Sequence, residues 1–193
     1  MFQIKLQGGV TVKKILGILG SPRKGGNSET LVERVLGCAG DRGAMTDVIR
    51  LQGLKLSGCI DCRKCWSRGS PCVIDDDMGK VHERIREADV LVFASPLYWY
   101  TWSSQMKPVW DRFLPFLHDE AGWDLKGKKA VLVATAGDDK PDAFDGMAFS
   151  FRTSCELLGL DHMEPLLAHG VYEVGDVKRG KWLEMAEELG RSL

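Results

Sequence analysis

The stretch KKILGILGSPRKGGNSETL, residues 13 to 31, decides the fold class. Its first part, KKILGILG, is a short apolar run of the kind that forms a buried β-strand. Gly20 allows a tight exit from that strand, and Asn27 or Ser28 can cap the helix that follows. A buried strand that leads through a small polar loop into a helix is the opening unit of an α/β fold.

The same alternation recurs along the chain. Further apolar runs predict strands at residues 45 to 51, 88 to 96, 129 to 137 and 163 to 170. Helical periodicity lies at residues 27 to 40, 77 to 87, 103 to 117, 141 to 159 and 176 to 190. Because parallel strands need a crossover and a helix supplies it, we predict one α/β domain over residues 1 to 193, a doubly wound five-stranded parallel sheet with helices on both faces. The first ten residues are interpreted as an extra edge strand or an arm.

Charge and composition limit the kinds of partner that the protein can bind. Lys and Arg number 26 against 27 Asp and Glu, which gives a net charge of -1 and no field to recruit nucleic acid or an anionic membrane. No apolar run suits a signal peptide or approaches the roughly 18 residues of a membrane span. We therefore expect a cytoplasmic protein with a small-molecule partner. In that compartment, clustered thiols are metal ligands or redox groups rather than disulfides.

The loop GSPRKGGNSETL, residues 20 to 31, carries groups that suit an oxyanion. Ser21 and Ser28 offer hydroxyls, Arg23 offers a cationic fork, and the start of the helix adds unpaired amide groups and its positive dipole end. The loop has no GxGxxG, and Gly26 stands where a P-loop would carry its lysine. These differences exclude a dinucleotide-binding loop and a P-loop, so we favour a site for another kind of phosphate. The alternative is a Gly/Ser turn that only caps a helix.

Two further loops leave the predicted sheet at the same edge. In open α/β sheets ligands bind beyond the carboxyl ends of the strands, where the strand order reverses. The third strand runs into ASPLYWYTWSSQMKPVWDR, residues 94 to 112, whose aromatic side chains offer a flat apolar surface for a planar ring. The fourth strand ends in small residues, Thr135, Ala136 and Gly137, which let a ligand approach the backbone. A core or interface role is the alternative for the aromatic residues.

Four cysteines stand together in CIDCRKCWSRGSPC, residues 59 to 72. Cys59, Cys62 and Cys65 are spaced CxxCxxC, and Cys72 follows after six residues, a spacing that suits one 4Fe-4S cluster. A four-cysteine zinc site is the main rival, although structural zinc usually takes two separated pairs. Redox-active thiols without metal are a further alternative. The surrounding segment, 52 to 76, is longer than a simple connection, and such loops in compact domains are commonly functional.

Other reactive residues receive structural interpretations. Asp75 to Asp77 are expected to cap the following helix. Cys38 and Cys155 sit at helical positions with apolar neighbours and are assigned no role. The histidines show no ligand spacing and are read as surface or core residues; they are His82, His118, His162 and His169.

The three motifs, in this order over residues 15 to 170, resemble the NADPH-dependent FMN reductase branch of the flavodoxin-like superfamily, and the cysteines are similar to those of the iron-sulfur flavoproteins. The resemblance implies the sheet order 2-1-3-4-5, FMN as cofactor and NAD(P)H as an electron donor. The residues implied at the FMN phosphate are Ser21, Arg23, Asn27 and Ser28. Those implied at the isoalloxazine are Pro96, Leu97, Tyr98 and Trp99, with Thr135 and Gly137 as looser assignments.

The resemblance also implies a function. The implied protein is an oxidoreductase in which electrons pass between a reduced donor, FMN and a 4Fe-4S cluster held by Cys59, Cys62, Cys65 and Cys72. Its partners are small-molecule or protein electron donors and acceptors. The alternatives are an NAD(P)H-dependent FMN or quinone reductase whose cysteines bind zinc or are structural, and a non-catalytic redox sensor. The family resemblance implies a homodimer or homotetramer, with Trp66, Trp102 and Trp110 as the aromatic residues that would cover the partner's flavin.

Overall fold

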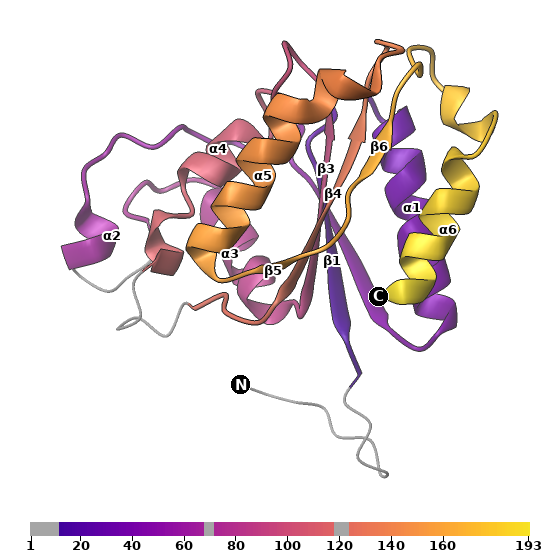
Figure 1. The fold of residues 1–193 in the computed structure, drawn as a ribbon. Helices are drawn as coiled ribbons and strands as arrows, with labels where there is room; N and C mark the ends of the chain where they lie inside the picture. Colours follow the sequence, from indigo (N-terminus) through magenta and orange to yellow (C-terminus); the bar gives the residue numbers. More distant parts are fainter. Residues whose placement is uncertain (1–11, 68–71, 118–123) are drawn as a thin grey trace.

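The computed structural model describes residues 12–67, 72–117 and 124–193, and these form a parallel sheet with helices on both faces (Figure 1). The strands are β1 (Lys14–Leu19), β2 (Met45–Arg50), β3 (Val90–Pro96), β4 (Lys129–Thr135), β5 (Asp161–His162) and β6 (Leu166–Ala168). The helices are α1 (Asn27–Asp41), α2 (Lys64–Ser67), α3 (Met78–Glu87), α4 (Lys107–Asp111), α5 (Asp145–Leu158) and α6 (Trp182–Ser192). Short 3-10 helices are η1 (Leu114–Leu117), η3 (Pro141–Phe144) and η4 (Asp176–Lys178).

The sheet order is β2-β1-β3-β4-β5, with β6 also paired to β4, and each of the described pairings is parallel. The predicted order 2-1-3-4-5 is therefore confirmed. The central strands β3 and β4 are buried along almost their whole length, because helices cover both faces. The edge strand β2 is largely exposed, and Ile49 is its one buried residue.

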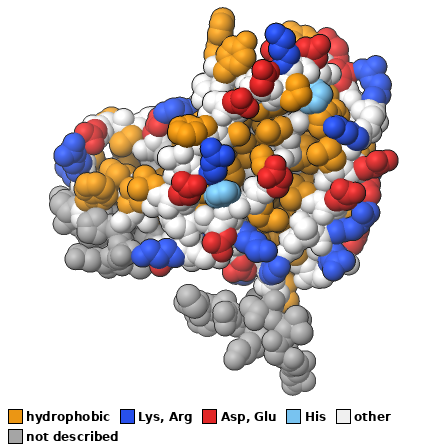
Figure 2. Space-filling model, in the orientation of Figure 1, with side chains coloured by type: hydrophobic (Ala, Val, Ile, Leu, Met, Phe, Trp, Pro, Cys, Tyr) orange, Lys and Arg blue, Asp and Glu red, His pale blue; other side chains and the backbone are white. Residues whose placement is uncertain are grey.

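Alternate residues of β1 feed two separate cores. Ile15 and Leu19 face the layer that contains α1 and α6, whereas Leu16 and Ile18 face the layer of α3, α4 and α5. Figure 1 shows these two helical layers on opposite sides of the sheet. In Figure 2, Lys and Arg side chains are interspersed with Asp and Glu on the face shown, as the balanced composition predicts.

Helices α1 and α6 approach each other closely at Gly190. A Cβ atom at this position would lie 2.4 Å from the carbonyl oxygen of Val35 and 2.9 Å from the Cβ of Cys38. Only a residue without a side chain lets α6 lie this near to the backbone of α1.

Several predicted elements differ in detail from the observed ones. The helix predicted over 103–117 is wrong as a single element, since only α4 and η1 form; Pro115 has no N–H, and its ring would clash with a helical carbonyl four residues earlier. The fifth strand is divided into β5 and β6 around Pro165. The last helix begins at Trp182 rather than 176, after Gly180 with φ of +81°. The one-turn helix α2 was not predicted.

The prediction for the first ten residues and the one for His118 lie outside the described residues. No helix in the described ranges has both the length and the apolar character needed to cross a membrane.

Candidate functional site

A cleft of about 110 Å³ lies beyond the carboxyl ends of β1, β3 and β4. Nine of the ten residues predicted to hold the cofactor line it: Ser21, Arg23, Asn27, Ser28, Pro96, Leu97, Tyr98, Thr135 and Gly137. The tenth, Trp99, lies outside the lining and is 93% exposed. The topology thus brings residues from three separate loops to the edge of the sheet where the strand order reverses.

The start of α1 forms one wall of this cleft. Its N-cap residue is Gly26, and no side chain caps the helix, so the prediction that Asn27 or Ser28 would cap it is wrong. The first amide groups of α1 therefore lack a side-chain acceptor and can serve an anion. Burial alone would raise the pKa of Glu29, but hydrogen bonds from Arg50 and from the Gly25 N–H lower it overall. Its negative charge is thereby neutralised by Arg50.

The side chain of Asn27 is used instead to hold a distant loop. Its Nδ2 donates to the carbonyl of Glu173 at 2.9 Å, and its Oδ1 accepts from the N–H of Gly175 at 2.9 Å. Arg23 Nη1 donates to the carbonyl of Tyr172 at 3.1 Å, and the guanidinium lies 5.8 Å from the centre of the Tyr172 ring. We call residues 171–176 the clasp loop. Its contacts hold it against residues 20–28, which we call the phosphate loop after the ligand predicted there.

Sequence reasoning missed the clasp loop as part of the site. Val171 and Tyr172 line the cleft, and a Cβ at Gly137 would lie 2.7 Å from the Tyr172 ring. The available signal was the position of HGVYEVGD directly after the fifth apolar run, because loops that follow parallel strands lie at the ligand edge.

The turn after β3 forms the rim of the cleft. Tyr98 and Thr101 exchange backbone hydrogen bonds of 3.0 and 3.1 Å around the two residues between them. Those residues, Trp99 and Tyr100, have φ of 49° and 63°. Positive φ at both central positions is the sign pattern of a type I′ turn, which usually takes Asn and Gly, so bulky aromatic residues are strained there. Such strain concentrates at functional sites.

A buried serine joins the phosphate loop to the aromatic turn. Ser103 donates from Oγ to the carbonyl of Gly20 at 2.6 Å and from its N–H to Ser95 Oγ at 3.1 Å. A Cβ at Gly20 would lie 2.9 Å from both Ser103 Oγ and the Cβ of Met106. Gly20 is therefore required where the predicted tight exit from β1 meets β3.

Trp102 is 5% exposed and belongs to the core, so its predicted covering role is wrong for this chain. Trp110 is half-buried and packs against the core with its ring centre 4.6 Å from that of Phe93, and its covering role stays a prediction. Trp66 is 40% exposed, and its indole N–H donates to the carbonyl of Leu114. The most exposed aromatic side chain near the cleft is Trp99.

A larger cleft, of about 250 Å³, lies between α4, η1 and α5. Its lining includes Trp102, Trp110 and Leu157, and it contains none of the predicted cofactor residues. The smaller cleft is the one that contains the predicted cofactor residues, because it combines the loop after β1, the aromatic turn and the ends of β3 and β4.

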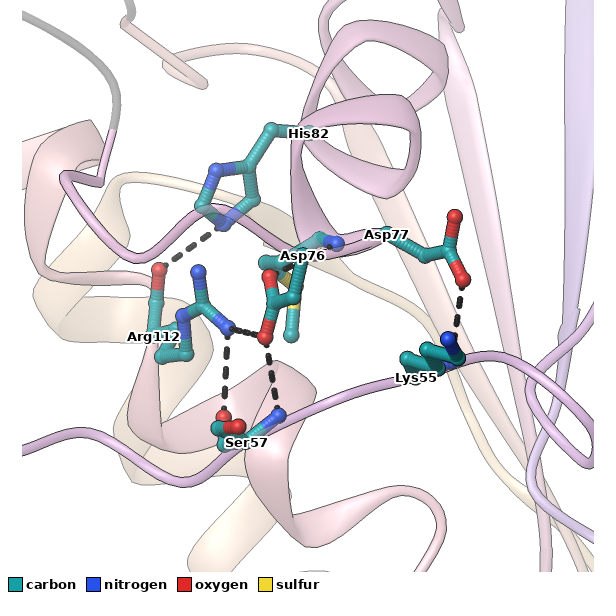
Figure 3. A network of polar contacts seen from close by, with 7 residues as sticks. Lys55, Ser57, Asp76, Asp77, His82 and Arg112 are labelled. Atoms are coloured by element: carbon teal, nitrogen blue, oxygen red, sulfur yellow. Dashed lines mark hydrogen bonds and ion pairs between the residues drawn. The ribbon is translucent and has the colours of Figure 1, made fainter.

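The two ends of the cysteine segment are tied together (Figure 3). Asp76 Oδ2 accepts from the N–H of Ser57 at 2.9 Å, and Asp77 Oδ2 accepts from the N–H of Lys55 at 2.9 Å. Arg112 Nη1 donates to Asp76 Oδ2 at 2.6 Å and to the carbonyl of Ser57 at 3.2 Å. The segment that carries the cysteines therefore leaves the domain and returns to it at one place.

These contacts correct the expected role of Asp75 to Asp77. Asp76 accepts from the N–H of Met78 at 3.1 Å, which serves the start of α3, but its main partner is Arg112, 1% exposed in its side chain. Asp77 occupies the N-cap position without a side-chain cap bond. Burial alone would raise the pKa of Asp76, but the hydrogen bonds from Arg112 and from the amides of Ser57 and Met78 lower it overall.

The cysteines differ in exposure. Cys59 and Cys62 are exposed, Cys72 is half-buried and Cys65 is buried. Burial, followed by the nearby Cys72 and Cys62, raises the pKa of Cys65, so these three thiols share one electrostatic environment. Within residues 12–67, 72–117 and 124–193, no three His, Cys, Asp or Glu side chains gather closely enough to bind a metal. The predicted ligand set of Cys59, Cys62, Cys65 and Cys72 remains a prediction.

The backbone of the segment is strained near its first cysteines. Asp61 and Arg63, on either side of Cys62, have φ of 47° and 54°. The N–H of Asp61 points at Cys59 Sγ, 3.4 Å away. A turn that directs an amide group at a cysteine sulfur suits a sulfur that carries negative charge.

His82 gives a pH-dependent prediction. It is fully buried, and its Nε2 lies 2.9 Å from the carbonyl of Arg112. Burial, and then the charge of Arg112, lowers the pKa of His82 from 6.5 to about 4. The unfolded chain therefore binds a proton on this ring below about pH 6.5, whereas the folded chain binds it only below about pH 4. Because the unfolded chain is favoured in that range, the free energy of unfolding falls by about 2 kcal/mol between pH 7 and pH 5.

Urea unfolding of the metal-free protein at both pH values measures this loss. The variant His82→Gln keeps a side-chain N–H and has no titratable ring, so the loss between pH 7 and pH 5 should shrink by most of that amount. An equal loss in the variant and the parent protein would contradict the assignment.

Cys155 gives a prediction on thiol reactivity. It lies in α5 with no exposed surface, and burial, with a smaller effect of Glu156, raises its pKa to about 12. Since the thiolate is the reactive form, Cys155 should escape alkylation by iodoacetamide at pH 8 while Cys59 and Cys62 react. Peptide mass spectrometry before and after denaturation reads this out. Modification of Cys155 at the rate of Cys59 in the native protein would refute the burial.

Fold, cleft and sequence together define the class of this protein. The chain belongs to the NADPH-dependent FMN reductase family, a family of FMN-dependent oxidoreductases, and matches its family model over residues 13–144.

Among its relatives, an iron-sulfur flavoprotein of Methanocaldococcus jannaschii is 36% identical over 187 residues, which are 93% of this chain and 95% of the relative. An iron-sulfur flavoprotein of Archaeoglobus fulgidus is 35% identical over 134 residues, which are 69% of this chain but 59% of the relative's length. A solved NAD(P)H:quinone oxidoreductase from Methanothermobacter marburgensis has a TM-score of 0.71 at 20% identity, covering 94% of this chain and 98% of that one, and shows the shared flavodoxin-like fold.

Proposed function

We propose that this chain is an FMN-dependent oxidoreductase of the iron-sulfur flavoprotein type, which transfers electrons between a reduced donor such as NAD(P)H, FMN and a 4Fe-4S cluster. The observation that carries the proposal is the cleft, where nine predicted residues from three loops surround the uncapped start of α1. The relatives named iron-sulfur flavoproteins support the cluster part of it.

The residues of the cleft fit FMN. Arg23, Ser21, Ser28 and the first amide groups of α1 would bind the phosphate, since together they provide a cationic fork, hydroxyls and the positive end of a fifteen-residue helix. Pro96, Leu97 and Tyr98 would support the ring, and small residues at the end of β4 leave its other side open. Bound FMN would supply the two-electron redox chemistry. No acid-base side chain is needed for that role.

The cysteine segment has the ligand chemistry of a metal centre, since it carries four thiols. Its two ends are fixed by Asp76, Asp77 and Arg112, and Cys62, Cys65 and Cys72 lie near enough to influence one another. A bound cluster would supply one-electron exchange. Within this arrangement the protein supplies the four thiolates and a fixed point of attachment.

Anaerobic purification followed by reconstitution with FMN, iron and sulfide tests the proposal. The protein should be yellow-brown, with flavin bands and a broad cluster absorbance that bleaches on reduction, and with iron and sulfide at about four each per chain. Conversion of Cys59, Cys62, Cys65 and Cys72 to serine should remove the broad absorbance and retain the flavin. A colourless protein after reconstitution would refute both parts of the proposal.

The second candidate is an NAD(P)H-dependent FMN or quinone reductase without a cluster, whose cysteines bind zinc or are structural. One observation favours the form in which the cysteines are structural: in the described part of the chain they are not gathered at metal-binding spacing. NADPH oxidation with a quinone as acceptor, at rates that do not change in Cys59→Ser, together with bound zinc or no metal, would select this alternative.

The remaining predictions from the sequence concern context. We propose that residues 1–193 act as one domain with a cysteine-rich insertion at about 52–76 and that the protein works in the cytoplasm as a homodimer or homotetramer. Light scattering of the purified protein, with and without FMN, measures the oligomeric state.

A further inference from the structure

Arg112 is a buried cation with two unused hydrogen-bond donors. Its side chain is 1% exposed, and Nη1 alone makes the bonds to Asp76 and to the carbonyl of Ser57. Its Nε and Nη2 atoms are buried and have no hydrogen-bond partner among the described residues. Proteins almost always pair such groups, so an unused pair in the interior indicates a missing acceptor.

The position of Arg112 relative to the cysteine segment indicates what that acceptor is. Ser57 and Asp76, which Arg112 bridges, lie two residues before Cys59 and four after Cys72. Cys72 lies close enough to interact with the guanidinium, and no hydrogen bond of normal geometry joins the two. In the metal-free protein the sulfur of Cys72 is therefore a neighbour of Arg112 but not yet its partner.

We propose that Arg112 is the hydrogen-bond donor to the metal-bound Cys72 thiolate, through its unused Nε and Nη2 groups. This rests on the proposed function, in which the four cysteines hold a metal centre. Arg112 is then a positioning residue, since it contacts a ligand and not the metal. Its buried charge favours the assembled thiolate set and, for a cluster, favours the reduced state, which carries one more negative charge.

Titration of the apoprotein with Co²⁺ alone, under reducing anaerobic conditions, tests the donor. The cobalt-thiolate absorbance reports binding by the cysteines whatever metal they hold in the cell. Arg112→Lys keeps the charge next to Asp76 but loses the planar fork, and Arg112→Gln loses the charge. Both should bind Co²⁺ at least about tenfold more weakly, the usual size of a loss from removing a hydrogen bond to a metal ligand.

The control is Arg63→Gln, which makes the same change of charge between Cys62 and Cys65. Arg63 is 69% exposed and pairs only with Asp61 among the described salt bridges, so solvent screens its charge. Its Co²⁺ affinity should stay within about twofold of the parent protein. If Arg112→Lys also stays within that range, or if Arg63→Gln loses as much as Arg112→Gln, the inference is overturned.

The reduction potential of the reconstituted cluster provides a readout that a loss of folding does not move. In Arg112→Lys we expect the reduction equilibrium to shift roughly tenfold toward the oxidised cluster. For one electron this makes the potential about 59 mV more negative. Should Arg112→Gln fail to fold, as thermal melting would show, Arg112→Lys carries the test. An unchanged potential with an intact cluster overturns the inference.

The outcomes separate the inference from the proposed function. If the parent protein binds Co²⁺ through its cysteines and the Arg112 variants bind it more weakly, but no cluster assembles, the inference stands and the cluster part of the function fails. If the parent protein does not bind Co²⁺ through its cysteines, the inference fails, whereas FMN binding is unaffected.

Discussion

Replacing Asn27 with aspartate is expected to weaken FMN binding by about a hundredfold or more, and riboflavin binding by less than about tenfold. Asn27 lines the cleft beside the start of α1 and is 9% exposed. Asn27→Asp hardly changes the shape of the side chain but places a negative charge where the FMN phosphate is proposed to bind. At about 4 Å two like charges near a protein surface repel by up to about 4 kcal/mol. Riboflavin has no phosphate and does not meet this repulsion.

Flavin fluorescence titrations with both ligands measure the two affinities. The control is Asn27→Ala, which removes the hydrogen bonds to Glu173 and Gly175 without adding charge, so both flavins should lose affinity by a similar factor. Equal losses of FMN and riboflavin in Asn27→Asp would show that the phosphate binds elsewhere.

The second large effect is expected at the contact between α1 and α6. Gly190→Ala places a methyl group 2.4 Å from the carbonyl oxygen of Val35, and because backbone atoms cannot move aside as a side chain tip does, the two helices must separate. We expect a loss of about 3 kcal/mol in the free energy of unfolding, the upper part of the usual range for overpacking.

The matched control is Gly37→Ala in α1. Its added Cβ would meet no atom within 4 Å, so it should keep or gain stability, by up to about 1 kcal/mol, from better helix propensity. Urea unfolding monitored by circular dichroism compares the two variants. A Gly190→Ala protein as stable as Gly37→Ala would refute the close approach of α6 to α1.

The parts of the fold and site that could be predicted are those with a local signature. Buried strands such as β3 and β4 are continuous apolar runs, because helices cover both of their faces. The loop from Gly20 to Ser28 has its chemistry in consecutive residues, and its neighbours at the carboxyl ends of β3 and β4 follow from the order of the strands. Local pattern, together with the sheet order and the residues that the family resemblance implies, therefore predicted most of the residues that line the cleft.

The parts that could not be predicted depend on contacts between distant residues. Arg112 stands beside Asp111 and has the sequence appearance of a surface residue, whereas in the folded chain it is buried and paired with Asp76, 36 residues earlier. The sequence indicates that Asn27 is a helix cap, but its side-chain amide instead donates to the carbonyl of Glu173 in the clasp loop, 146 residues later. Charged and amide side chains acquire such partners only in the folded chain, so the periodicity of the sequence does not predict these contacts.

The contacts between Asn27 and the clasp loop join residues that are synthesised at different times. A ribosome releases the strand and loop of the phosphate site first, and domains form as the chain emerges. The carbonyl of Glu173 and the N–H of Gly175 are synthesised about 150 residues afterwards, so these contacts cannot form before then. If FMN needs the complete cleft, as proposed, it binds each molecule only after residues 173–175 have left the ribosome.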